Sequence, residues 1–307
     1  MNSLRGIVIL SEKDDFNAMH LYKSIKKKDI HCIFIDSRRL SFDYDIYLNL
    51  SGENIRFLNT NALKYSYFIR AVNLVPLNPY HFSDRKLYTQ YRNYYSLFFS
   101  FVEIVNSLGV KVVNPPSTFW CHYFKPFTYK IAKDTGFDIP LTIVTPSFRQ
   151  VYKIYKEYAS KKQMVYKPVA GGKNVKILRN IEEFPKDDEV YIFQEVIHGK
   201  NVRVFTLGDN FTAGFYLMYD TEKSIDYRDL DPDEVKVCTC EIPNQLSDKC
   251  IKLARTIGLR FSGIDLIFDG DKYYFLDINP APMFYGFEYQ SGYPLTDKII
   301  DYLLCVE

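Results

Sequence analysis

The segment SGIDLIFDGDKYYFLDINP, residues 262–280, carries the pattern that decides the fold. Two apolar runs flank the turn-forming segment Gly270–Lys272, which predicts a β-hairpin with a three-residue loop. Asp277 and Asn279 are two residues apart on the second strand, so their side chains point to the same face. A three-residue loop would place Asp265 directly opposite Asp277 on that face. Because Asp and Asn are depleted in strands, their presence among apolar neighbours indicates a binding site.

Two carboxylates and an amide oxygen that converge form a set of hard oxygen ligands. Mg²⁺ prefers such ligands and is usually held by one or two carboxylates together with nucleotide phosphates. We therefore predict that Asp265, Asp277 and Asn279 bind Mg²⁺, as one or two ions and with Mn²⁺ as an alternative. The competing interpretation is a solvent-facing strand edge that binds nothing.

A second pattern lies in MVYKPVAGGKNVKIL, residues 164–178, where Lys167 ends an apolar run just before Gly171-Gly172. One interpretation is an ordinary Gly-Gly hairpin with a solvated lysine. The other is a loop whose backbone N–H groups approach phosphates that Lys167 neutralises, because glycine has no Cβ to obstruct them. The P-loop pattern GxxxxGK[ST] is absent, so this is not a Walker loop.

The first third of the chain predicts a parallel sheet. Buried strands are expected at residues 6–10 and 31–36, with a helix at 17–28 between them, which is a βαβ start. Further strands are expected at 46–50, 64–72 and 110–114, and an apolar stripe predicts a core-facing helix at 84–107. Pro115-Pro116 marks a domain boundary.

The rest of the chain predicts two α+β units. Helices are expected at 118–135, 147–160, 247–258 and 295–304, and strands at 139–145, 164–168, 174–178, 191–197 and twice within 201–220. With the closing hairpin, this order predicts three domains: 1–115, 116–190 and 191–307. A chain of 307 residues is long enough for them.

Composition excludes several classes of protein. Hydrophobic residues make up 47% and charged residues 25%, as in a globular protein, and the net charge of +2 with interspersed signs predicts no nucleic-acid partner. No run of 18 apolar residues exists, so no membrane association is expected, and the N-terminus predicts a strand rather than a signal peptide. The six cysteines lack zinc-site spacing, which indicates a reducing cytoplasm.

Two further patterns are weak when taken alone. The strand YIFQEVI, residues 191–197, turns polar at Gln194-Glu195, where an adenine slot or an ordinary half-exposed strand are both possible. Lys125 lies early in a predicted helix, where a lysine is usually solvated.

Order and spacing connect these patterns. Lys125, Lys167 with its glycine pair, Gln194-Glu195, Arg203, Asp265 and Asp277-x-Asn279 together resemble the ATP-grasp superfamily over residues 110–305. The phrases YKPVAGGKNVKIL, QEVIHGKNVRVFTLGD and GIDLIFDGDKYYFLDINPAP are similar to those of RimK-type glutamate ligases. They are similar also to those of the maturases of graspetide (microviridin-type) peptides. The resemblance implies a mixed α/β and α+β ATP-grasp fold with a Rossmann-like N-terminal domain and the nucleotide between the central and C-terminal domains.

The resemblance also implies roles for residues. Lys125 and Lys167 would contact ATP phosphates, beneath a loop of Gly171, Gly172, Lys173 and Asn174. Gln194, Glu195, Val196 and Ile197 would line the adenine slot. Arg203 and Arg228 would act on the transferring phosphoryl group, although a surface ion pair of Arg228 with Asp226 or Asp229 is the alternative. Arg70 is a candidate for holding a substrate carboxylate.

The function implied is an ATP-dependent ligase that joins a carboxylate to an amine or hydroxyl acceptor through an acyl phosphate. Its partners would be ATP and the two substrates, for which a peptide is a candidate, and a homo-oligomer is left open. A small-molecule kinase of the same fold and a nucleotide-binding scaffold are the alternatives. Two departures matter: Asp277 stands where RimK-type ligases usually carry Glu, and Asn201 where an acidic residue is common.

Overall fold

The computed structural model describes residues 6–37, 45–51, 54–70, 84–159, 161–169, 175–185 and 189–305. The chain forms two compact units. The first comprises Met1–Phe119, Gly258–Phe261 and Pro280–Glu307, and the second comprises Trp120–Ile257 and Ser262–Asn279. The C-terminal segment therefore packs with the N-terminal one, and the predicted division into three domains stays a prediction.

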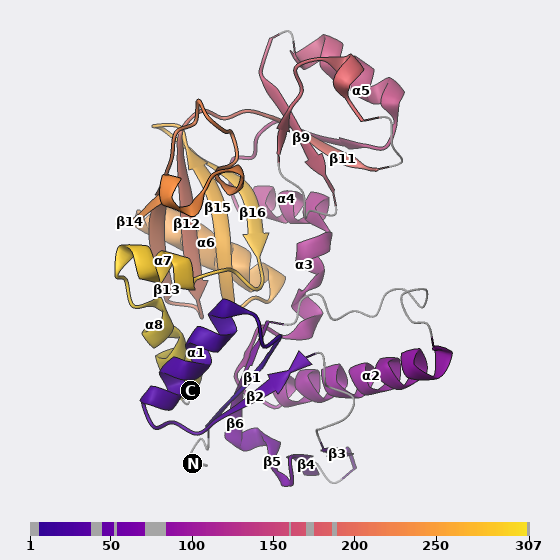
Figure 1. Cartoon of the computed structure of the whole chain (residues 1–307), viewed down its shortest axis with the longest axis vertical. Coiled ribbons are helices and arrows are strands. Elements are labelled where there is room, and N and C mark those ends of the chain that lie inside the picture. Colours follow the sequence, from indigo (N-terminus) through magenta and orange to yellow (C-terminus); the bar gives the residue numbers. More distant parts are fainter. Residues whose placement is uncertain are drawn as a thin grey trace. The chain divides into compact units, whose positions relative to one another are not determined.

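The first unit is built on a four-stranded sheet with the order β2-β1-β6-β7 (Figure 1). Its strands are β1 (Gly6–Ser11), β2 (Cys32–Asp36), β6 (Tyr65–Ile69) and β7 (Val112–Val113), and every pairing is parallel. Helix α1 (Phe16–Lys27) connects β1 to β2. The predicted βαβ start and its parallel sheet are confirmed.

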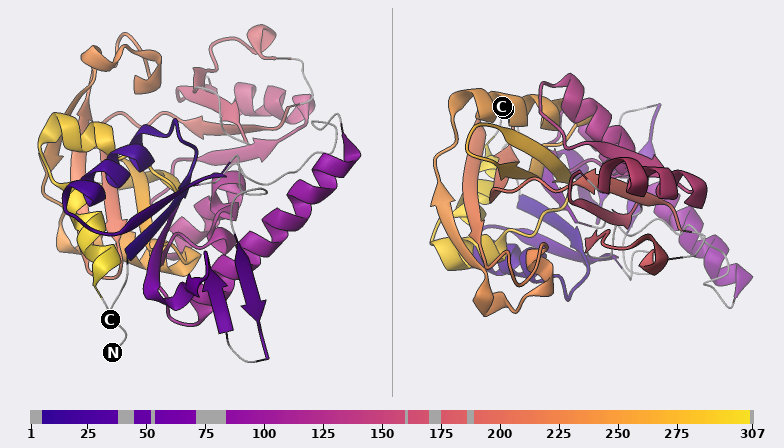
Figure 2. Two further views of the ribbon diagram at one scale, coloured as in Figure 1. Left: turned by 60° about the horizontal axis from the view of Figure 1, so that its bottom comes forward. Right: turned by 90° about the horizontal axis from the view of Figure 1, so that it is seen from above.

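Three helices complete this unit. Helix α2 (Arg85–Ser107) places Phe98, Phe101, Val102 and Val105 in the core, as its predicted apolar stripe requires. Helices α7 (Tyr285–Ser291) and α8 (Leu295–Leu304) return from the end of the chain to lie beside α1 (Figures 1 and 2). Helix α8 was predicted from its pattern, whereas α7 was not.

A small antiparallel meander adds to the first unit. It consists of β3 (Ile46–Asn49), β4 (Asn54–Phe57) and β5 (Thr60–Asn61), in the order β3-β4-β5. Only β3 was predicted. The buried side chains of Ile55 and Phe57 join the core that α2 covers, so β4 alternates between exposed and buried positions.

The second unit contains a small sheet with the order β10-β9-β11-β8. Its strands are β8 (Thr142–Thr145), β9 (Met164–Pro168), β10 (Lys176–Ile177) and β11 (Tyr191–Glu195), and all pairings are antiparallel. Helix α5 (Phe148–Ile154) runs into one turn of π-helix at Tyr155–Ala159. An aromatic core that includes Tyr166, Phe184, Tyr191 and Phe193 holds this sheet together.

The larger sheet of the second unit has the order β14-β13-β12-β15-β16. Its strands are β12 (Lys200–Leu207), β13 (Phe211–Met218), β14 (Lys236–Cys240), β15 (Phe261–Phe268) and β16 (Tyr273–Asn279). Helix α6 (Asn244–Ile257) packs on β12 and β13. The predicted pair of strands around Gly208-Asp209 is confirmed, whereas the edge strand β14 was not predicted.

The helix predicted at 118–135 is wrong as a single element. The chain forms a 3₁₀ turn at Pro116–Thr118, then α3 (Trp120–Tyr123) and α4 (Lys125–Asp134), with Phe124 in a non-helical conformation between the two helices. Proline cannot continue a helix that precedes it, because it lacks an N–H group and its ring clashes with the previous turn. Pro126 therefore starts α4 anew and places Lys125 at its first position.

In the part of the chain that the structure describes, there is no helix both long and apolar enough to cross a membrane.

Candidate functional site

The hairpin of β15 and β16 places Asp265 directly opposite Asp277, as predicted. The turn differs from the prediction, because Asp269–Lys272 form a four-residue connection in which Gly270 has a φ of 110°. This pairs Leu266 with Phe275, and a β-bulge then shifts the register by one residue before Asp265 meets Asp277. The bulge compensates for the longer turn and restores the predicted pair.

The bulge adds the residue Leu276, and its carbonyl accepts a hydrogen bond from a side chain of α4. The Tyr129 hydroxyl of α4 donates to the Leu276 oxygen at 2.8 Å and accepts from Lys167 Nζ at 3.0 Å. Tyr129 is buried, and burial raises the pKa of its hydroxyl, so it remains a neutral donor. One phenol thus connects α4, the hairpin and β9, which the sequence did not indicate.

Asp277 is paired with a lysine from α4. Lys125 Nζ lies 2.6 Å from Asp277 Oδ2, and the lysine side chain is only 9% exposed, in contrast to an ordinary solvated lysine. Burial opposes ionisation of Asp277, but Lys125 and Lys167 outweigh it and lower the pKa of this carboxyl. The carboxylate is therefore charged at neutral pH, as a metal ligand must be.

Asp265 is paired with the buried Arg203 of β12. Arg203 Nε and Nη2 donate to the two carboxylate oxygens at 2.5 and 2.9 Å, which is the bidentate geometry that suits a guanidinium. Burial alone would lower the pKa of Arg203, but Asp265 outweighs it and raises the pKa. The hairpin thus has a cation on each of its two paired carboxylates.

Lys167, at the end of β9, is the third cation of the cluster. Besides its hydrogen bond to Tyr129, its Nζ lies 5.7 Å from the centroid of the Tyr129 ring. Burial lowers the pKa of this lysine, while the nearby Asp277 opposes that shift. An ammonium that is poorly solvated in this way gains most from a closely placed anion.

Arg228 is the fourth cation and lies in a 3₁₀ turn, Tyr227–Asp229. Its Nε and Nη2 donate to Asp226 at 2.8 and 2.5 Å, so the ion pair considered as an alternative is present. The Arg228 side chain is nevertheless 49% exposed. Its charge also acts on Lys167, for which it lowers the pKa. The ion pair therefore does not remove Arg228 from the cluster.

The residues predicted for the adenine slot have structural partners. Gln194 is buried and donates to Thr142 Oγ1 at 3.0 Å, while Glu195 accepts from the Leu141 N–H at 3.0 Å and pairs with Lys162. The Val196 N–H donates to the Gln163 carbonyl at 2.8 Å. These contacts fix the end of β11, and adenine binding by Gln194, Glu195, Val196 and Ile197 stays a prediction.

Two groups of predicted residues are not brought to the cluster by any described contact. Arg70 lies in the first unit, where its Nε donates to Asp15 at 2.8 Å and its Nη1 donates to the Pro282 carbonyl at 2.7 Å. Its role toward a substrate stays a prediction. Gly171, Gly172, Lys173 and Asn174 lie outside the described residues.

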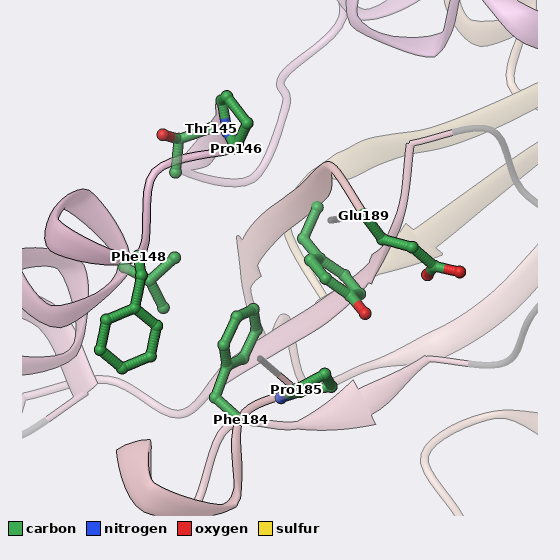
Figure 3. Close-up of a pocket in the computed structure, with 8 residues that line it drawn as sticks. Thr145, Pro146, Phe148, Phe184, Pro185 and Glu189 are labelled. Atoms are coloured by element: carbon green, nitrogen blue, oxygen red, sulfur yellow. The ribbon is translucent and has the colours of Figure 1, made fainter. Parts of the chain in front are cut away.

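A small cavity of about 210 Å³ lies elsewhere in the second unit (Figure 3). It is lined mainly by apolar side chains around α5 and the small sheet, including Phe148, Val151, Phe184 and Tyr191. None of the predicted site residues lines it, so we do not assign it to the nucleotide.

The metal ligands stay a prediction, but the donor set fits Mg²⁺. Asp265 and Asp277 face each other, and Asn279 lies two residues along β16 on the same side of the strand. Among the described residues, no three His, Cys, Asp or Glu side chains gather closely enough to bind a metal ion. The predicted set instead combines two carboxylates with an amide, and phosphate oxygens would complete it.

Comparison with known proteins identifies the family. The ATP-grasp domain model matches residues 125–283, just over half of the chain. The alpha-aminoadipate–LysW ligase LysX of Sulfurisphaera tokodaii is 25% identical over 213 residues, which are 64% of this chain and 73% of the relative. The tetrahydromethanopterin:alpha-L-glutamate ligase of Methanocaldococcus jannaschii is 22% identical over 212 residues, 64% of this chain and 70% of that protein.

Solved structures support the same fold over the whole chain. The ATP-grasp ligase PsnB in complex with a minimal precursor has a TM-score of 0.81 and 22% identity, with 98% of each chain covered. An ATP-grasp ligase of Chryseobacterium gregarium, bound to ADP and to a leader and core peptide, has a TM-score of 0.72 and 18% identity and covers 99% of this chain and 96% of its own. The predicted fold and the predicted family are confirmed, and the curated relatives are ligases: the chain belongs to the ATP-grasp family.

Proposed function

We propose that this protein is an ADP-forming ligase that joins a carboxylate to an amine or an alcohol through an acyl phosphate. The observation that carries the proposal is the cluster of Lys125, Lys167, Arg203 and Arg228 around the paired carboxylates of the hairpin. Four cations and two carboxylates provide what a triphosphate with its metal requires: positive charge near its oxygens and oxygen ligands for the ion. The ligase activity of the family's named members supports this assignment.

In the first step, a carboxylate oxygen of the substrate attacks the γ-phosphorus of ATP. The bond from phosphorus to the β–γ bridging oxygen breaks, and ADP leaves. Lys125 and Lys167 would hold the phosphates in line, because each is poorly solvated and lies at a rigid position, the start of α4 and the end of β9. Charge develops on the phosphoryl oxygens in this step, where the guanidinium of Arg228 would stabilise it.

In the second step, the amine or hydroxyl acceptor attacks the acyl carbon. The bond from that carbon to the phosphate oxygen breaks, inorganic phosphate leaves, and the acceptor gives up a proton. The chain contributes position and charge rather than a covalent nucleophile. Arg203, fixed on Asp265, would remain beside the oxyanion that forms.

Asp265, Asp277 and Asn279 would hold the magnesium. When bound, the ion would supply positive charge that offsets the charge developing on the phosphate oxygens. Lys125 pairs with Asp277 across 2.6 Å, so the lysine can serve both the carboxylate and a nearby phosphate. Asp277 is one methylene shorter than glutamate, and we propose one principal ion, with a second left to measurement.

For the substrate class, we propose an amino acid or a peptide with an acidic side chain. The named relatives ligate glutamate and α-aminoadipate, and the structurally similar ligases were solved with precursor peptides. The names of both groups thus refer to amino acids or peptides, and we propose the same class of substrate for this chain.

The test is hydroxamate trapping. The protein is incubated with ATP, Mg²⁺, hydroxylamine and a panel of carboxylates: L-glutamate, L-α-aminoadipate and peptides with Asp or Glu side chains. A ligase forms a hydroxamate and releases ADP and phosphate together. A kinase would instead leave a stable phosphorylated product, and a scaffold would release nothing above background, so that either result would refute the proposal.

Helix α4 provides a matched control for this test. Lys125→Ala removes a buried cation that pairs with Asp277, whereas Lys130→Ala removes an exposed one that pairs with Asp134 on the same helix. We expect Lys125→Ala to lower hydroxamate formation by about 10²-fold and Lys130→Ala to leave it unchanged. Equal rates of hydroxamate formation for the two variants would show that Lys125 takes no part in the reaction.

A further inference from the structure

The carboxylate that binds Arg228 is more deeply buried than its partner. Asp226 is 5% exposed, and its Oδ1 accepts from both the backbone N–H and Nε of Arg228, at 3.1 and 2.8 Å. Its Oδ2 accepts from Nη2 at 2.5 Å. A bidentate pair of this kind fixes the plane of the guanidinium, while about half of the arginine side chain stays open to solvent and ligands.

The same carboxylate also reaches the small sheet. Asp226 Oδ2 accepts from the Val175 N–H at 3.2 Å. Val175 directly precedes β10, and β10 pairs with β9, the strand that carries Lys167. One side chain therefore links the turn that carries Arg228 to the sheet that carries the phosphate lysine.

The backbone of Asp226 is fixed from the larger sheet. Ser224 Oγ exchanges hydrogen bonds with Asp226, accepting from its N–H at 3.1 Å and donating to its carbonyl at 3.0 Å. Tyr219 donates to the Ile225 carbonyl at 3.2 Å and accepts from Asn201 of β12 at 3.0 Å. β12 also carries the buried Arg203. The hydrogen bonds therefore fix the position of Asp226 relative to the strand of this arginine.

Building on the ligase function proposed above, we propose that Asp226 is a positioning residue of the reaction. Its carboxylate orients the guanidinium of Arg228 and, through Val175, sets the distance between the turn that carries Arg228 and the small sheet that carries Lys167. Asp226 itself touches neither substrate nor phosphate in this assignment. It acts through Arg228 and Val175, and the acyl-phosphate step depends on it because the two cations must meet the same phosphoryl group.

The principal test compares two ion pairs of one loop. Asp226→Ala removes the carboxylate, whereas Lys223→Ala removes an exposed cation of the same loop that pairs with Glu234 at 2.6 Å. The substrate is the carboxylate of the panel that gives a hydroxamate with the wild-type protein. With this substrate, we expect Asp226→Ala to lower kcat by about 10- to 100-fold. The KM for ATP should change less than about threefold, since Lys125 and Lys167 keep their partners. Equal kcat values for Asp226→Ala and Lys223→Ala would overturn the proposal.

A double-substitution cycle separates positioning from general destabilisation. If Asp226 acts through Arg228, then Asp226→Ala should have little further effect on kcat in a chain that already carries Arg228→Ala. Independent, multiplicative losses would overturn the assignment. Asp226→Asn has the same shape as the wild-type residue and keeps one oxygen acceptor. We expect this variant to be more active than Asp226→Ala, because it can still accept one hydrogen bond from Arg228.

Amide hydrogen exchange of Val175 tests the link without any turnover. In the full chain, Asp226→Ala should speed exchange of this amide by at least about tenfold, and Lys223→Ala should not change it. If the exchange rate of the Val175 amide is unchanged in Asp226→Ala while the wild-type protein is active, only the proposed link between Asp226 and Val175 is overturned. Absence of hydroxamate from the wild-type protein with every carboxylate of the panel would instead overturn the ligase function, and the positioning role with it.

Discussion

Each unit of the molecule contains a buried arginine paired with an aspartate, and the two pairs have similar burial but different surroundings. In the first unit, Arg70 pairs with Asp15 at 2.8 Å, with side chains 6% and 20% exposed. In the second unit, Arg203 pairs with Asp265 at 2.5 Å, with side chains 6% and 26% exposed. Burial and distance therefore do not distinguish the pair of the first unit from the pair in the candidate site.

The remaining hydrogen bonds distinguish the two pairs. Asp15 also accepts from the N–H groups of Asn17 and Ala18 as the N-cap of α1, and Arg70 also donates to the Pro282 carbonyl. Every one of these contacts serves the backbone. Around Arg203 and Asp265, by contrast, three more cations and a second carboxylate lie close enough to shift one another's pKa values. A dense group of charged side chains that act on one another is therefore the better indicator of function.

The largest expected effect comes from removing the second carboxylate beside the Arg203–Asp265 pair, which is Asp277 in its ion pair with Lys125. Asp277→Asn should abolish turnover, lowering hydroxamate formation by at least about 10³-fold, because it removes a metal ligand and the anion that faces Lys125 and Lys167. Asn279→Ala should act in the same direction. Both variants should keep the circular dichroism spectrum of the wild-type protein. Near-normal activity of either variant at limiting Mg²⁺ would refute the metal assignment.

A loss of stability is the main effect expected at the pair of Arg70 with Asp15. Asp15→Asn keeps a side chain that can cap α1 but leaves the buried Arg70 without an anion, which should cost about 3 kcal/mol of unfolding free energy. Activity per folded molecule should not change. Urea unfolding measures the first quantity and active-site titration the second. Asp134→Asn, at the exposed pair with Lys130, is the control and should cost little. A loss of activity without a loss of stability in Asp15→Asn would give the first unit a role in the reaction.

A smaller effect is expected for nucleotide binding. Lys167→Ala should weaken ATP binding by about 10- to 30-fold, because a charge-assisted hydrogen bond to phosphate is lost. Lys173→Ala should weaken it less, since Lys173 is predicted from the sequence to lie on a glycine loop and not at the end of a strand. Calorimetric titration with ADP and a non-hydrolysable ATP analogue would measure both. Unchanged affinity in Lys167→Ala would remove this lysine from the nucleotide site.

The smallest effect is a pH dependence that sharpens the comparison. Burial tends to raise the pKa of Asp15, but Arg70 and the N–H groups of α1 outweigh it and lower the pKa below 3.8. A carboxyl with a lowered pKa stabilises the folded state above its unfolded value and loses that contribution as the pH falls through the folded value. The stability difference between wild type and Asp15→Asn should therefore be constant near neutrality. Below pH 3.8 it should shrink, by at most about 1.4 kcal/mol per pH unit. A difference that grows on acidification would contradict this sign.

The sequence predicted the parts of the fold that depend on periodicity. The parallel sheet of the first unit, the apolar stripe of α2 and the closing hairpin follow from alternation and helical spacing, which are local properties. The break between α3 and α4 was also available from the sequence, because Pro126 marks it. The short strands β4, β5 and β14 were missed, since their length of two to five residues leaves too little pattern to detect.

The site could be predicted only as far as residue types and order allowed. Asp265 and Asp277 were paired from the hairpin alone, but their partners Arg203 and Lys125 come from distant segments. Tyr129 and Asp226 were not predicted as part of the site, because a tyrosine in a helix and an aspartate in a loop carry no signal of their own. Their importance follows from what they contact, which only the tertiary structure defines.

The bulge in β16 makes the tip of the hairpin and its base dependent on each other. With the four-residue turn, Leu266 pairs with Phe275. The extra residue Leu276 then shifts the register by one residue, so that Asp265 pairs with Asp277. If Leu276 were drawn into regular pairing, it would lie opposite Asp265 in place of Asp277, and Asp277 would lie opposite Ile264. The hydrogen bond from Tyr129 to the Leu276 carbonyl therefore favours the register in which the two carboxylates face each other, so that a helix elsewhere in the chain helps to set the pairing of this hairpin.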